Sequence, residues 1–69
     1  MTVGTLIKIK PEHLPWLFNG EEIQNRLRHA IGVIVKQSID DDGEPVYQIA
    51  ISGTTYEWFE PRELEVICK

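Results

Sequence analysis

Residues 46–59 read VYQIAISGTTYEWF, and this stretch decides the fold. Apolar residues alternate with other residues on both sides of Gly53, which is the two-residue period of a half-buried strand. A glycine between two such runs is typical of a tight β-hairpin. We therefore predict two antiparallel strands joined by a two-residue loop, Gly53-Thr54.

This loop fixes which hairpin side chains share a face, because side chains alternate along a strand. One face, predicted to point toward the core, carries Tyr47, Ile49, Ile51, Tyr56 and Trp58. The opposite face carries Val46, Gln48, Ala50, Glu57 and Phe59. Phe59 is therefore predicted to lie outward as a candidate partner-binding aromatic, in the manner of the aromatic ridges that bind proline-rich peptides.

Three further segments have the pattern of strands. Residues 3–10 alternate, with Ile7 and Ile9 on the apolar side, and residues 64–67 alternate again. Residues 31–39 are rich in β-branched side chains, and the acidic run that follows, residues 40–45, has the composition of a turn. The chain is thus predicted to be mainly β, with five strands.

The long connection over residues 11–30 has a different pattern. Residues 20–28 are predicted to form one short helix, with Asn19 as its N-cap and Glu22 in the capping-box position. Ile23 and Leu27 are four residues apart and share a face, and the spacing of Glu22 and Arg26 suits an i,i+4 ion pair. Such a short helix needs tertiary packing to be stable.

Composition limits what the chain does. Its 69 residues are sufficient for a single domain, residues 1–69, and leave little room for a substrate cavity with its own support. The net charge of −4 provides no general attraction for nucleic acid or an anionic membrane, so we expect a protein partner. No export signal or membrane-spanning segment is evident, and the one cysteine, Cys68, favours a reducing compartment.

No group of residues has the spacing of a catalytic or metal site. His13, His29 and Cys68 are widely separated, and the acidic run lacks the alternating carboxylates and final glutamate of a calcium loop. No nucleophile is tied to a base, and no glycine-rich phosphate loop is present. We expect no enzymatic activity, no cofactor and no bound metal, with the acidic run forming a solvated hairpin tip.

The order of these segments resembles the SH3-like barrel, through residues 4–10, 32–36, 47–53 and 56–67. Within that fold the chain resembles small barrel proteins of tailed bacteriophages, which end in a similar pattern of tryptophan, proline and Glu-Leu-Glu-Val-Ile, here Trp58, Pro61 and residues 63–67. It resembles the variable chain of ferredoxin–thioredoxin reductase less closely. The phage resemblance implies a five-stranded SH3-like small barrel, with one short helix in its long first loop.

The same resemblance implies a non-catalytic protein–protein interaction module that docks on a larger assembly. It would be either a minor virion component or a factor that binds a host protein, located in the virion or the host cytoplasm. The predicted partner surface is the long loop, with Trp16, Leu17 and Phe18 as apolar contacts and Arg26 and Arg28 at the rim. The competing interpretation is that the aromatic residues fill the open end of the barrel, and a divided role is a third possibility.

The second function class is a nucleic-acid-associated barrel of the KOW or Tudor kind. It would need the basic side chains to gather into one patch: Arg26, Arg28, His29, Lys8, Lys10 and Lys36. Against it, the arginines have carboxylate partners within reach in sequence, namely Glu12, Glu21 and Glu22. We therefore do not expect nucleic acid to be the main partner.

Overall fold

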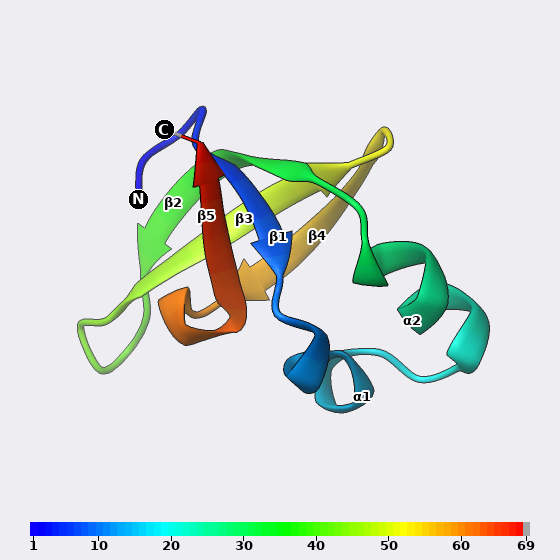
Figure 1. The fold of residues 1–69 in the computed structure, drawn as a ribbon. Coiled ribbons are helices and arrows are strands. Elements are labelled where there is room, and N and C mark those ends of the chain that lie inside the picture. Colours follow the sequence, from blue (N-terminus) through cyan, green and yellow to red (C-terminus); the bar gives the residue numbers. More distant parts are fainter. Residues whose placement is uncertain (69) are drawn as a thin grey trace.

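A computed structural model describes residues 1–68 of the chain. Its strands are β1 (Leu6–Ile9), β2 (Gly32–Ile39), β3 (Pro45–Ile51), β4 (Thr54–Phe59) and β5 (Leu64–Cys68). All neighbouring strands are antiparallel and form one sheet in the order β4-β3-β2-β1-β5 (Figure 1). The first strand therefore lies between β2 and the last strand of the chain.

The predicted mainly β architecture with five strands is confirmed, as a single antiparallel sheet. Within residues 1–68 no hydrogen-bonded pairing joins the edge strands β4 and β5, so hydrogen bonds do not close the sheet into a barrel. Register shifts interrupt the pairing of β1 with β5, of β2 with β3 and of β3 with β4. Such irregularities bend strands and increase their twist, which is consistent with the curved sheet in Figure 1.

The hairpin between β3 and β4 turns one residue earlier than predicted. Ile51 pairs with Thr54, so the loop is Ser52-Gly53 and not Gly53-Thr54. Both loop residues have positive φ, 51° for Ser52 and 80° for Gly53. Two positive φ values in a two-residue loop match the right-handed twist of the flanking strands, which explains why the chain turns here.

A bulge in β4 then changes which aromatic residue faces the core. Tyr56 pairs with Ile49 and Phe59 pairs with Tyr47, so Glu57 and Trp58 together oppose the single residue Gln48. As a result Phe59 is 3% exposed and Trp58 is 41% exposed. The predicted inward Trp58 and outward Phe59 are both wrong, because one extra residue in the strand reverses the alternation beyond it.

The long connection contains more helix than predicted. It holds a 3₁₀ turn, η1 (Pro11–His13), and two α-helices, α1 (Leu14–Leu17) and α2 (Glu21–Arg28). The predicted helix over residues 20–28 is confirmed as α2, whereas α1 was not foreseen. The predicted cap is wrong: the N-cap is Gly20, with no side-chain hydrogen bond. Gln24 instead ties α2 to the preceding segment, since its Nε2 donates to the carbonyl oxygen of Phe18 at 2.8 Å.

Both helices contribute to the same core as the sheet. The buried apolar side chains are Ile7, Ile9, Leu14, Leu27, Ile34, Tyr47, Ile49, Ile51, Phe59 and Leu64. Burial of a leucine stabilises a protein by roughly 1.5–3 kcal/mol, so Leu14 and Leu27 together contribute an amount comparable to the whole stability of a small domain. The long connection is therefore an integral part of the fold.

Candidate functional site

The side chains of α1 point in opposite directions. Leu14 is completely buried, whereas Trp16 is 86% exposed, the largest exposed fraction among the large apolar residues described. Two residues correspond to about 200° around a helix, so burial of Leu14 directs Trp16 toward solvent. Leu17, three residues after Leu14, is partly buried and packs against the core. The helix thus holds one tryptophan on the outside of the molecule.

Phe18 turns inward immediately after α1. Its ring meets that of Tyr56 edge to face, with centroids 5.5 Å apart, and lies 6.3 Å from the ring of Phe59. Of the three predicted apolar contacts, Phe18 and Leu17 therefore attach the long connection to the sheet, and Trp16 alone is mostly exposed. Leu17 and Phe18 thus pack against the core, as the competing interpretation of a filling role expected, whereas Trp16 does not.

The two predicted rim arginines lie on different sides of α2. Both arginines are exposed. Arg26 lines a pocket between α2 and the β3–β4 hairpin, whereas Arg28 does not line this pocket. The predicted ion pairs with Glu12, Glu21 and Glu22 are wrong: the one salt bridge within residues 1–68 joins Arg62 Nε to Glu60 Oε2 at 2.6 Å. The arginines of α2 are thus available to other groups.

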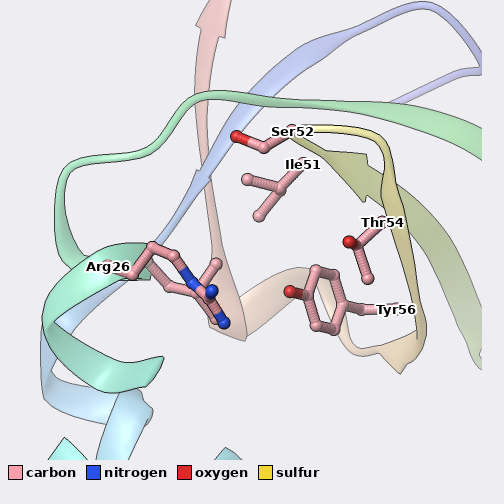
Figure 2. A pocket seen from close by; sticks show the side chains of 6 residues that line it. Arg26, Ile51, Ser52, Thr54 and Tyr56 are labelled. Atoms are coloured by element: carbon pink, nitrogen blue, oxygen red, sulfur yellow. The ribbon is translucent and has the colours of Figure 1, made fainter. Parts of the chain in front are cut away.

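The pocket beside Arg26 has a volume of about 80 Å³. Its other lining residues are Leu27, Ile51, Ser52, Thr54 and Tyr56. Figure 2 shows the Arg26 side chain reaching from α2 toward the Tyr56 hydroxyl, with Ile51 and Ser52 above them and Thr54 beside the ring. No sequence pattern marks the three hydroxyl residues as a site, although the Ser-Gly dipeptide is a turn marker that places Ser52 at the hairpin tip.

Phe59 is buried among core residues and its side chain is not part of the surface. Its place as an outward aromatic is taken by Trp58, where the Nζ of Lys36 lies 6.0 Å from the ring centroid. Next to them Gln48 Nε2 donates a hydrogen bond to Glu57 Oε1. Sequence alternation could not reveal this cluster, because it exists only through the bulge in β4.

The acidic run over residues 40–44 forms the exposed tip between β2 and β3. Asp40 Oδ1 accepts the backbone N–H groups of Asp42 and Glu44, each at 2.9 Å. One carboxylate therefore organises the turn, as aspartate commonly does. In the described part of the chain no three histidine, cysteine, aspartate or glutamate side chains are grouped to hold a metal ion.

Comparison of the chain with protein-family models, with curated proteins and with solved structures found no match. None of the helices over residues 1–68 is long and apolar enough to cross a membrane.

Proposed function

We propose that the chain is a non-catalytic protein–protein interaction module that docks on a larger assembly, with Trp16 as its anchor. The observation that carries this proposal is the 86% exposure of Trp16 on a helix whose two leucines, Leu14 and Leu17, pack inward. Tryptophan offers a large contact area with few rotatable bonds and is enriched among the residues that dominate binding energy. Leu14, Leu17 and Phe18 hold the helix, so the anchor is largely pre-organised.

The SH3-like small barrel is part of the same proposal. The antiparallel order β4-β3-β2-β1-β5, with β1 between β2 and the last strand β5, supports it. The 3₁₀ turn η2 (Pro61–Glu63), directly before β5, adds support, since the resemblance to SH3-like barrels includes a single turn before the last strand. The resemblance of residues 58–67 to tailed-phage barrels further supports a role as a minor virion component or as a factor that binds a host protein. The assembly would then be a virion or a host complex, in the virion or in the host cytoplasm.

The proposal is tested by removing the anchor while the fold is kept. Wild type, Trp16→Ala and Trp58→Ala are labelled, and each is sedimented with virions or with large assemblies fractionated from host extract. Trp58→Ala is a matched control, because it removes the same side chain from β4. We expect Trp16→Ala to lose co-sedimentation at an unchanged melting temperature, and Trp58→Ala to keep it.

Two results would contradict the proposal. Equal co-sedimentation of wild type and Trp16→Ala would remove α1 from the docking surface. Tight binding to DNA or heparin that weakens steeply with salt would replace the protein partner by nucleic acid and favour the KOW or Tudor alternative.

A further inference from the structure

The pocket beside Arg26 has the composition of a site for a small anion. It lies between α2 and the tip of the β3–β4 hairpin, so it is formed by two separate parts of the chain (Figure 2). Four of its six lining residues carry hydrogen-bond donors, and no carboxylate lines it. The charge of this pocket is therefore opposite to that of the whole chain, which has a net charge of −4.

The donors of this pocket are not engaged elsewhere. Within residues 1–68, the side chains of Arg26, Ser52, Thr54 and Tyr56 take part in none of the side-chain hydrogen bonds and not in the salt bridge. A guanidinium presents five N–H donors in a fixed plane, and each hydroxyl adds one donor. The pocket therefore offers several donors to a group with acceptor oxygens.

The size and charge of the pocket select the anion. A volume of about 80 Å³ accepts a group of a few non-hydrogen atoms, since one water molecule needs roughly 10–15 Å³. A single guanidinium matches a singly charged carboxylate in bidentate geometry, whereas a doubly charged phosphate would keep an unbalanced charge. Leu27 and Ile51 give the pocket an apolar wall that suits the carbon atoms next to a carboxylate.

We propose that this pocket binds a carboxylate group, with Arg26 as the ion partner and Ser52, Thr54 and Tyr56 as hydroxyl donors. The carboxylate belongs either to a free short-chain acid or to a protein chain, as an acidic side chain or a C-terminus. This site does not depend on docking through Trp16, which the lining of the pocket does not include.

The first test is a titration of the ¹⁵N-labelled full chain with sodium propionate, followed by amide NMR spectra. Sodium chloride at the same ionic strength is the reference. We expect saturable shifts at Arg26 and at residues 51–56, with a dissociation constant on the order of 1–10 mM for so small a ligand. Shifts that match those with chloride, or that do not saturate, would overturn the proposal.

Variants then identify the groups that bind. Arg26→Gln should weaken binding at least about tenfold, because it removes a charge-assisted bidentate contact. Arg28→Gln is the matched control, since it removes the same charge from the same helix outside the pocket, and its affinity should stay that of wild type. Tyr56→Phe keeps the ring that packs on Phe18 and should weaken binding about threefold through loss of the hydroxyl. Equal effects of the two arginine variants would overturn the proposal.

Further ligands test whether the pocket prefers a carboxylate to other anions. They also distinguish the two sources of the carboxylate, a free short-chain acid and a protein chain. Inorganic phosphate that binds more tightly than propionate would overturn the carboxylate assignment. Acetyl-alanyl-alanine with a free C-terminus should bind, whereas its C-terminal amide should not, and equal binding of both would also overturn it. Tighter binding of the peptide acid than of propionate assigns the site to a protein carboxylate, and the reverse order assigns it to a free short-chain acid.

Discussion

The rings of Phe18 and Tyr56 meet edge to face, with centroids 5.5 Å apart and planes at 89°. Phe18 belongs to the long connection and Tyr56 to β4, so this contact joins two segments that are distant in sequence. The Tyr56 ring contacts Phe18, and Tyr56 also lines the pocket beside Arg26. The same pair therefore positions α1, which presents Trp16, and one wall of the proposed carboxylate site.

Phe18 and Trp16 should differ strongly in their effect on stability. Phe18→Ala removes the ring that packs on Tyr56 and Phe59, and should lower the free energy of unfolding by about 2–4 kcal/mol. Trp16→Ala removes an exposed side chain and should change that free energy by no more than about 0.5 kcal/mol. Urea unfolding followed by far-UV circular dichroism measures both. Similar losses in the two variants would show that Trp16 is part of the packed structure.

The adjacent residues Trp58 and Phe59 provide a test of the bulge in β4. Phe59→Ala should cost about 3–5 kcal/mol, because the side chain is buried in the core. Trp58→Ala should cost about 1 kcal/mol, since the ring is partly exposed and its main specific partner is the ammonium of Lys36. Thermal unfolding separates these values, because 1 kcal/mol shifts the melting temperature of such a domain by roughly 4–8 °C. A larger shift for Trp58→Ala would place the tryptophan inward.

The hairpin shows how far the sequence could predict the fold. Alternation located four of the five strands, and β-branched composition located β2; alternation also put Ile7, Ile9, Ile49 and Ile51 in the core, because burial on one face imposes a period of two. Alternation carries no information on where a strand gains an extra residue, so the positions of Trp58 and Phe59 were exchanged. The pocket was missed for a similar reason: Arg26 and Ser52 come together only when α2 packs beside the hairpin tip.

Trp16 should be almost fully accessible to solvent in the isolated protein. The chain has two tryptophans, so Trp58→Phe leaves Trp16 as the single tryptophan. We expect red-shifted emission and efficient quenching by acrylamide, because the indole is 86% exposed. Association through α1 would bury the ring, shift its emission to the blue and protect it from acrylamide. Blue-shifted, protected emission in the free protein would show that Trp16 is already covered.

The Ser52-Gly53 turn predicts that substitution of Gly53 by alanine destabilises the protein, whereas substitution of Ser52 by glycine is tolerated. Gly53 has a φ of 80°, so Gly53→Ala should cost about 1–2 kcal/mol through the left-handed penalty. Ser52 already adopts a φ of 51°, so Ser52→Gly removes the same penalty from the folded state. The greater flexibility of the unfolded glycine chain acts in the opposite direction. The two effects offset each other, and the free energy of unfolding should change by less than about 1 kcal/mol. Urea unfolding of both variants measures these effects. A turn at Gly53-Thr54 would instead make Ser52 an ordinary strand residue, so Ser52→Gly would destabilise the protein with no relief of a left-handed penalty to offset the loss.

Position 32 requires glycine because a side chain there would clash with Ile51. A Cβ atom built on Gly32 would lie 2.6 Å from Ile51 Cγ1 and 2.9 Å from the carbonyl oxygen of Ala50. Both distances are shorter than a normal contact, and the second neighbour is backbone in a paired strand. Gly32→Ala should therefore cost about 1–3 kcal/mol by overpacking, seen as a lower midpoint of urea unfolding.

The double variant Gly32→Ala/Ile51→Ala tests the cause of this cost. Ile51→Ala removes Cγ1, so the added methyl group meets one short contact instead of two. The two changes should then be non-additive, with the double variant more stable than the sum of the single effects by about 1 kcal/mol. Part of the cost should persist, because the Ala50 carbonyl oxygen remains in place. Strict additivity would mean that the glycine is needed for a reason other than its contact with Ile51.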